Sequence, residues 1–218
     1  MALRFYKFFW ILALPLLISC TALLNNKPHQ TSYYALKYVP TKTVSNLNNS
    51  ELLPILIVST PKSVAGLNTH KMLYSRKPLQ IEYFAHNEWI DTPANMLQNI
   101  LTSSLEHTGL FKAVMLKTSA IKSEYRLDSQ LLSLVQNFES KPSHIEFSLK
   151  VTLIDNQTNQ VMASRVFIEQ AVTQADTPAG GASAANMAVH AVLDEIAIFV
   201  NQTLSKSPNQ ITKYQITK

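Results

Sequence analysis

The segment 145–153 alternates strictly between apolar and polar residues, which limits what this part of the chain can form. A two-residue period places one set of side chains on a core and the other in water, as in a half-buried β-strand. A polar turn over 155–159 follows, 161–171 returns as a partner strand, and 125–138 precedes the pair. We therefore predict an antiparallel meander of three long strands. The alternating apolar residues are Ile145, Phe147, Leu149, Val151 and Leu153.

A first helix is predicted to begin near Asp91 and to end before Gly109. Asp91 or Thr92 can cap it, and Pro93 suits its first turn, where a backbone N–H is not needed. A glycine such as Gly109 is typical of the position just past a helix end. The apolar residues between these signals share one helical face. They are Leu97, Ile100, Leu101 and Leu105.

A second helix is predicted from Asn186 to about Leu204. The segment 177–183 before it is rich in Pro, Gly and Ser, which favours a loop in which Gly180 and Gly181 ease the turn. The apolar residues of the helix again fall on one side. They are Val189, Val192, Leu193, Ile196, Phe199 and Val200.

Shorter runs of apolar and aromatic residues predict further strands. With the meander and the helices they predict an α+β fold, in which a two-layer domain has a mostly antiparallel sheet and two main amphipathic helices packed on one face. The only cysteine, Cys20, cannot form an intrachain disulfide, so the apolar core must stabilise the fold alone. The shorter runs are 33–38, 52–59, 71–75, 79–84 and 111–116.

The N-terminal segment has the three parts of a secretory signal and ends directly before Cys20. Arg4 and Lys7 form its charged start, and an apolar run continues to Leu17. The sequence Leu-Ile-Ser-Cys that closes it resembles a bacterial lipobox, at which a diacylglycerol is attached to the cysteine sulfur and the chain is cut before it. We therefore predict a signal peptide over 1–19 and a covalent lipid on Cys20, with acyl chains such as palmitate.

Two other interpretations of this segment stay open. One is an uncleaved transmembrane helix, although the apolar stretch 8–18 is about half of the roughly 20 residues that a span needs, and Pro15 interrupts it. The other is that Cys20 is a buried core thiol.

The lipobox interpretation divides the rest of the chain into three parts. Residues 20–31 form the lipidated cysteine and a flexible tether, 32–204 a folded domain, and 205–218 a loose tail without apolar density. Thr21 stands where an aspartate would tend to retain a lipoprotein at the inner membrane. We therefore predict a domain that is lipid-anchored at the periplasmic face of the outer membrane.

Charge and motifs argue against several classes of function. The cut leaves 19 − 2 = 17 basic against 14 acidic residues, and this scattered net charge of +3 gives little support to nucleic-acid binding. No histidine lies at metal-ligand spacing from another, and the four glycines cannot form a phosphate-binding loop. With Cys20 bound to lipid, no thiol nucleophile is left. We expect no enzyme activity, no metal and no cofactor beyond the covalent lipid.

Aromatic residues gather in the first half of the chain. Most of them suit the core or a sheet face, and the alternative is that some line a protein contact or a groove for acyl chains. Trp89 stands just before the first predicted helix, where it can pack on the helix start or anchor an interface. The aromatic residues concerned are Tyr33, Tyr34, Tyr74, Tyr83, Phe84 and Trp89.

The order of these features resembles the ABC-type transport auxiliary lipoproteins of the PqiC type. The resemblance covers nearly the whole chain after the cut and begins with the lipobox. The features that follow, in order, are Tyr34-Ala35-Leu36, an apolar strand at 55–58, Met72-Leu73-Tyr74-Ser75-Arg76, a strand over 79–83 that leads to Trp89, the first helix, the meander, and an Ala-rich helix over 184–200.

The resemblance implies a non-enzymatic accessory of a lipid transport system between two membranes. The partners it implies are a periplasmic MCE-domain protein, an inner-membrane ABC-type transporter, a phospholipid, and further copies of this chain in a ring. It makes Tyr34, Tyr74, Arg76 and Trp89 candidate contacts with the partner or with acyl chains. The alternative is a structural or assembly lipoprotein of another cell-envelope complex. An envelope hydrolase comes third.

Overall fold

The computed structural model of the chain describes residues 30–39, 53–116 and 122–206. The predicted signal peptide over 1–19 and Cys20 lie outside these residues. The same holds for most of the predicted tether and of the predicted tail. The interpretations of these segments therefore stay predictions.

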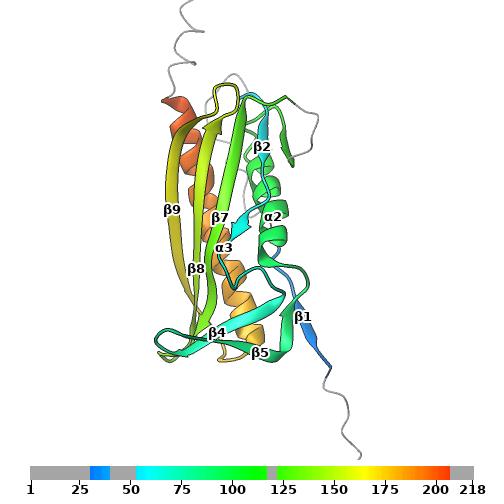
Figure 1. Cartoon of the computed structure of the whole chain (residues 1–218), viewed down its shortest axis with the longest axis vertical. Helices are drawn as coiled ribbons and strands as arrows, with labels where there is room; N and C mark the ends of the chain where they lie inside the picture. Colours follow the sequence, from blue (N-terminus) through cyan, green and yellow to red (C-terminus); the bar gives the residue numbers. More distant parts are fainter. Residues whose placement is uncertain (1–29, 40–52, 117–121, 207–218) are drawn as a thin grey trace, which may run out of the picture. The chain divides into compact units, whose positions relative to one another are not determined.

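The chain divides into two units, Met1–Thr31 and Ser32–Lys218. Every element named below belongs to the second unit. Within the described residues it contains a nine-stranded sheet and two helices (Figure 1). The α+β class is thus confirmed.

The predicted meander is confirmed as the long part of the sheet. β7 (Tyr125–Asn137), β8 (His144–Asp155) and β9 (Gln160–Val172) pair antiparallel in this order. The alternating apolar side chains of β8 are at most 3% exposed, because they face the core. These side chains are Ile145, Phe147, Leu149, Val151 and Leu153.

Short strands occupy the second edge of β7, one after another, and all of them run parallel to it. β2 (Leu56–Val58) pairs with the start of β7, β3 (Lys62–Ser63) with its middle and β4 (Lys71–Lys77) with its end. Since β2 has neighbours on both sides, all of its residues are buried. This fits the continuous apolar run that predicted it.

Three further strands extend the sheet beyond these short ones. β5 (Gln80–Trp89) pairs antiparallel with β4 and runs five residues past the predicted end at Phe84. β1 (Ser32–Tyr34) runs parallel to the last residues of β5, and β6 (Val114–Leu116) runs parallel to β2. The extra length of β5 is therefore the part that pairs with β1.

The first helix, α2 (Pro93–His107), begins where its signals predict. The Asp91 carboxylate accepts the Thr92 N–H at 2.6 Å and the Asn95 side-chain amide at 3.1 Å, so it orders the entry to the helix. Gly109 follows the helix with a φ of +65°, a conformation that glycine adopts without strain.

The second helix, α3 (Pro178–Ser205), begins eight residues earlier than predicted, so the expected loop over 177–183 is wrong. Thr177 caps the helix, because its hydroxyl accepts the Gly180 N–H at 3.1 Å, and Pro178 occupies the first position. Gly180 and Gly181 lie inside the helix, at positions where the neighbouring atoms leave no room for a side chain. An added Cβ would lie 2.1 Å from the Ala175 carbonyl oxygen at Gly180 and 2.2 Å from the Gln136 amide oxygen at Gly181.

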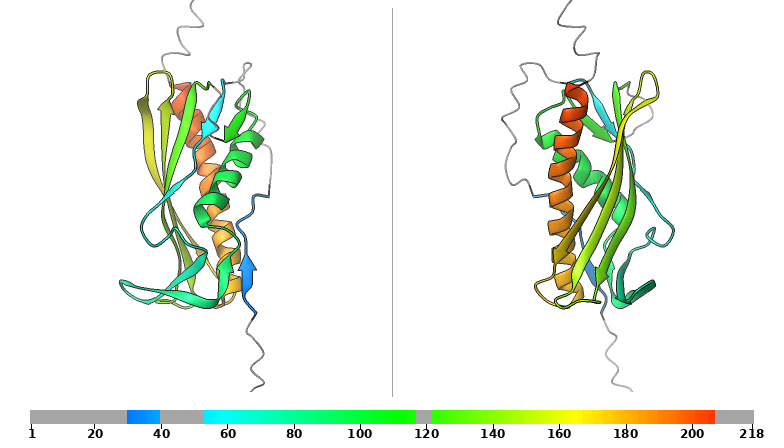
Figure 2. Two further views of the ribbon diagram at one scale, coloured as in Figure 1. Left: turned by 45° about the vertical axis from the view of Figure 1, so that its right-hand side comes forward. Right: turned by 90° about the vertical axis from the view of Figure 1, so that its left-hand side faces the viewer.

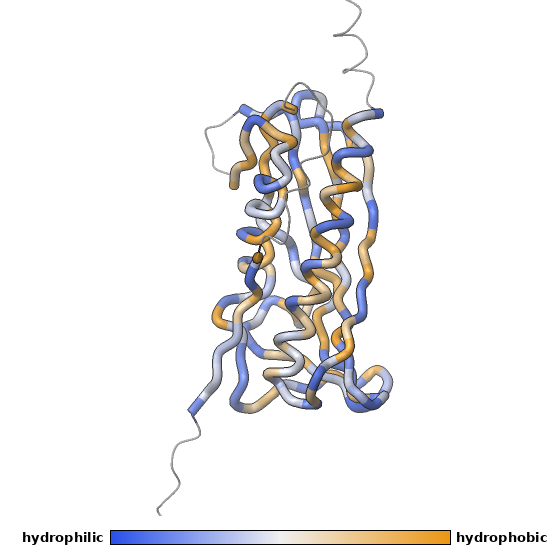
Figure 3. The backbone as a smooth tube through the Cα atoms, turned by 180° about the vertical axis from the view of Figure 1, so that it is seen from behind, coloured by the Kyte–Doolittle hydropathy of each residue, from blue (hydrophilic) through white to orange (hydrophobic). Residues whose placement is uncertain are grey.

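Both helices pack on one face of the sheet, α3 against β8 and β9 and α2 against β2, β6 and α3 (Figure 2). Along the helices and the strands, hydrophobic residues alternate with hydrophilic ones, as the colours of the backbone tube show (Figure 3). By length and composition alone α3 could cross a membrane, but its apolar face lies in the core of this unit. The largest side chains exposed by less than 2% are Phe147, Phe167, Leu97, Leu101, Leu127, Leu131, Ile196 and Leu204, among others.

Candidate functional site

The hairpin of β4 and β5 brings Tyr74 and Arg76 together around Glu82. The Tyr74 hydroxyl donates to Glu82 Oε2 at 3.0 Å, and Arg76 Nε donates to Glu82 Oε1 at 2.9 Å. Arg76 Nη2 also pairs with Glu82 Oε2, so the guanidinium binds the carboxylate in a bidentate manner. The cluster links two of the predicted contact residues through one carboxylate that was not predicted.

The charges of this cluster shift the pKa values of its members. Hydrogen bonds from Arg76, and then from Tyr74, hold the pKa of Glu82 below its usual value. The Tyr74 pKa is raised, first because its hydroxyl donates to the Glu82 carboxylate. Since the Glu82 pKa is lower in the folded than in the unfolded chain, the ionised carboxylate stabilises the fold at neutral pH. That contribution is lost as the pH falls through the lowered pKa.

Aromatic rings support this face of the hairpin. The ring centroids of Tyr74 and Phe84 are 4.4 Å apart, and Phe138 meets Tyr74 edge-on at 5.9 Å. The Arg76 guanidinium lies 5.6 Å from the centroid of the Tyr74 ring. An arginine over packed aromatic rings is a composition that is enriched where proteins bind each other.

The opposite face and the tip of the hairpin expose apolar side chains. Leu79 is fully exposed, Ile81 is 51% exposed and Tyr83 is 48% exposed. We call these three residues the hairpin surface. Lys71 Nζ lies 4.9 Å from the centroid of the Tyr83 ring and adds a positive charge beside it.

Leu79 holds a conformation that leucine rarely adopts. Its φ is +65°, and Pro78 precedes it, so the pair occupies the two central positions of a turn that favours glycine or asparagine second. A side chain in this region costs about 1–2 kcal/mol. Strain of this kind at an exposed apolar residue is typical of positions kept for function rather than stability.

The two remaining predicted contacts, Tyr34 and Trp89, lie at the end of β5 that is far from the hairpin tip. Tyr34 and Trp89 are opposite each other in the β1–β5 register, and the Tyr34 hydroxyl donates to the Asn87 side chain at 3.2 Å. Trp89 is 3% exposed and belongs to the core. Its ring therefore supports the end of β5 and does not present itself to a partner. Cys20 lies outside the described residues.

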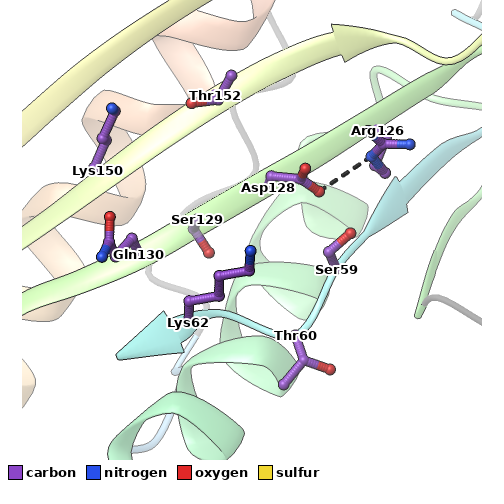
Figure 4. A pocket seen from close by; sticks show the side chains of 9 residues that line it. All are labelled: Ser59, Thr60, Lys62, Arg126, Asp128, Ser129, Gln130, Lys150 and Thr152. Carbon is purple, nitrogen blue, oxygen red and sulfur yellow. Dashed lines mark hydrogen bonds and ion pairs between the residues drawn. The ribbon is translucent and has the colours of Figure 1, made fainter. Parts of the chain in front are cut away.

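A polar hollow of about 510 Å³, the polar pocket, lies where the short strands meet the long ones (Figure 4). Val58 ends β2 opposite Leu127, and Lys62 begins β3 opposite Gln130. Three residues, 59–61, thus lie beside only two of β7, and regular pairing is interrupted there. The lining residues are Ser59, Thr60, Lys62, Arg126, Asp128, Ser129, Gln130, Lys150 and Thr152.

Sequence reasoning missed the polar pocket altogether. Its residues come from three segments that are far apart in the sequence, and none of them forms a motif. Only the register assembles it, since Lys62, Gln130 and Lys150 form one cross-strand row. In the described part of the chain, no three His, Cys, Asp or Glu side chains come together as a metal site.

Comparison with known proteins agrees with this fold. The model of a family described as the ABC-type transport auxiliary lipoprotein component matches residues 34–197. The crystal structure of protein XCC0632 from Xanthomonas campestris is 18% identical and superposes with a TM-score of 0.72, covering 81% of this chain and 98% of that one. A second crystal structure, of an uncharacterized protein, is 15% identical with a TM-score of 0.61, covering 78% and 99%. No curated protein matches the sequence.

Proposed function

Because the chain belongs to the ABC-type transport auxiliary lipoprotein family, we propose that it is a non-catalytic accessory of a lipid transport system between two membranes. The observation that carries this proposal is the family match over 34–197, which spans nearly the whole folded unit. The partners we propose are a periplasmic MCE-domain protein and an inner-membrane ABC-type transporter. In this role the chain binds and positions other components and performs no chemistry itself.

The proposed anchor is lipid on Cys20, which holds the folded unit at the periplasmic face of the outer membrane. The sequence supports this placement through the lipobox that ends at Cys20 and through Thr21 after it. A diacylglycerol with a further acyl chain is enough for stable attachment, since each buried methylene contributes about 0.8 kcal/mol. The tether over 20–31 then links the anchor to the fold.

The hairpin surface is the contact that we propose for the MCE-domain protein. Leu79, Ile81 and Tyr83 expose apolar area on one hairpin, and Lys71 places positive charge beside the Tyr83 ring. Apolar and aromatic anchors with a charged rim are the usual make-up of a protein contact. The packed rings of the other face hold the hairpin in shape, so little order has to be gained on binding.

Self-association is a further part of the proposal. β9 pairs only with β8 among the described strands, so its outer edge is free for another strand. Natural proteins usually protect such an edge, and a second copy is one means of doing so. The edge strand also exposes aliphatic side chains, which suits a buried contact. They are Val161, Val166, Ile168 and Val172.

The test is site-specific crosslinking in the native envelope. A photoreactive amino acid in place of Ile81 should crosslink to the MCE-domain protein. The same amino acid in place of Ile198, which is exposed on α3, is the matched control and should give no such product.

The lipid anchor is tested separately: Cys20→Ser should remove the chain from the membrane fraction. If the photoreactive residue at position 81 crosslinks only to components of another cell-envelope complex, the chain is instead a structural or assembly lipoprotein of that complex.

Leu79→Gly is expected to raise stability and to weaken partner binding at once. Glycine adopts the positive φ without strain, so the free energy of unfolding should rise by about 0.5–1 kcal/mol, after allowance for the greater freedom of glycine in the unfolded chain. The exposed side chain is lost, so the yield of the crosslink from position 81 should fall. Urea unfolding and quantitative crosslinking measure the two effects.

The control for this prediction is Ile198→Ala, which also removes an exposed aliphatic side chain. It should leave the crosslink yield unchanged. A Leu79→Gly variant that crosslinks as well as the unaltered chain would show that the tip of the hairpin makes no contact with the partner.

A further inference from the structure

β9 carries one arginine and one glutamate, placed symmetrically about the buried ring of Phe167. Arg165 stands two residues before Phe167, and Glu169 stands two residues after it. In the pairing with β8, Arg165 is opposite Val151, which faces the core. Glu169 is opposite Phe147, which faces the core too. The three residues of β9 therefore lie on the face of the sheet that α3 covers.

The two charges differ in how far the chain itself compensates them. Arg165 Nη2 pairs with Glu195 Oε2 of α3 at 3.1 Å, and the guanidinium lies 4.8 Å from the centroid of the Phe167 ring. The Arg165 side chain is nevertheless 54% exposed, so it has N–H groups left for a second acceptor. The Glu169 side chain forms no hydrogen bond or ion pair with another residue of the described ranges. Its carboxylate therefore lacks a cation at the edge of the sheet.

The other face of β9 is aliphatic on both sides of the same central residue. Val166 is 44% exposed and Ile168 is 71% exposed. Neither helix covers this face, because both pack on the opposite one (Figure 2). The backbone edge between the two faces is unpaired as well, since β9 pairs only with β8 among the described strands (Figure 1). β9 thus presents open hydrogen-bonding groups between a charged face and an aliphatic face.

A second copy of the same strand fits this edge in one antiparallel register. Two copies that continue each other's sheet in this way are related by a twofold axis perpendicular to the sheet, so their helices stay on one face. Residues of the charged face then lie opposite residues of the charged face, which requires the axis to pass through a residue position. With the axis at Phe167, Arg165 lies opposite Glu169 of the second copy, and Glu169 lies opposite its Arg165. On the other face, Val166 and Ile168 lie opposite each other in the same way.

Other registers lose this match. If the axis moves by one residue, to Val166 or Ile168, neither charge has an opposite charge across from it. If it moves by two residues, to Arg165 or Glu169, two like charges lie directly opposite, which is destabilising. Inward-pointing charges on an edge strand also oppose pairing with unrelated strands. The charges of β9 therefore disfavour other strands and other registers, and they complement themselves in a single one.

We propose that two copies of this chain pair through the outer edges of β9, antiparallel, with the twofold axis at Phe167. Two ion pairs between Arg165 and Glu169 then form on the helix face, and two contacts between Val166 and Ile168 form on the other face. This inference rests on the self-association in the proposed function and adds to it a register and a closed dimer. Because such a contact is complete with two copies, a ring of more copies needs a second, different contact.

The test measures the dissociation constant of the dimer by sedimentation equilibrium. The full chain is purified with its anchor in detergent, with micelles in excess over chains, and the unaltered chain should dimerise. Arg165→Glu and Glu169→Arg each place like charges opposite each other twice. Each variant alone should therefore raise the dissociation constant by about tenfold or more. A mixture of the two variants should regain the affinity as a heterodimer, because both positions of each chain then meet the opposite charge again.

The mixture separates pairing from folding, because a variant that fails to fold cannot be rescued by another. Glu195→Gln removes the partner of Arg165 within the chain and leaves the edge unaltered, so this control should dimerise as the unaltered chain does. The proposal is overturned if the unaltered chain sediments as a monomer, or if the mixture dissociates as readily as each variant alone. A dimer that is insensitive to both charge reversals overturns the register and leaves self-association standing. None of these results bears on the MCE-domain partner, which the crosslink from position 81 tests.

Discussion

Trp89→Ala is expected to lower the free energy of unfolding by about 3–5 kcal/mol, the usual cost of removing a large buried ring. Trp89 is 3% exposed and packs in the core at the end of β5. The backbone N–H of Trp89 donates to the His70 carbonyl at 2.7 Å, and the backbone N–H of the next residue, Ile90, donates to the Tyr34 carbonyl at 2.8 Å. The cavity would thus open where β5, β1 and the start of α2 meet.

Urea unfolding followed by circular dichroism measures this loss. The matched control is Tyr83→Ala, on the same strand, because Tyr83 is half exposed and its ring packs less. That variant should lose less than about 1 kcal/mol. Equal losses in the two variants would contradict the placement of Trp89 in the core and would return it to the candidates for partner contact.

The meander could be predicted because each of its strands is long enough to show a period. β8 alternates between apolar and polar residues over 145–153, and its neighbours are joined to it by short connections with turn residues. The start of α2 could be predicted for a similar reason, since Asp91, Thr92 and Pro93 give three concordant local signals. In both cases the information lies within a few residues of the element.

The parallel strands could not be predicted in this way. β2 and β3 pair with β7 across gaps of more than 60 residues in the sequence, and three or two residues show no period. The start of α3 was missed for a different reason. Two adjacent glycines favour a loop by propensity, but in α3 they occupy helical positions where Ala175 and Gln136 leave no room for a side chain, so the glycines serve packing and do not mark a loop.

In the candidate site, too, the residues on one strand could be predicted to lie together, and those brought together by strand pairing could not. Tyr74 and Arg76 stand two residues apart on one strand, so their shared face follows from the period of a strand. Their partner Glu82 comes from the neighbouring strand and depends on the register Tyr74–Glu82. Lys62, Ser59 and Ser129 depend on register entirely, and a single sequence carries no signal that joins them.

Gly180→Ala is expected to lower the free energy of unfolding by about 2–3 kcal/mol, although alanine is the better helix former by about 1 kcal/mol. A Cβ at this position would lie 2.1 Å from the Ala175 carbonyl oxygen, which is backbone and has no rotamer by which to move away. The same oxygen accepts the Thr177 N–H at 2.8 Å. Relief of the clash would therefore disturb the turn that places the cap of α3.

The control is Ser183→Ala, three residues further along the same helix at an exposed position. It should raise the free energy of unfolding by a few tenths of a kcal/mol, as helix propensity alone requires. If close packing excludes a side chain at position 180, chemical denaturation should show a lower free energy of unfolding for Gly180→Ala and a higher one for Ser183→Ala. A Gly180→Ala variant as stable as the control would mean that α3 begins after the glycines, where the composition of the segment predicts, because only a loop there could accept the added methyl group.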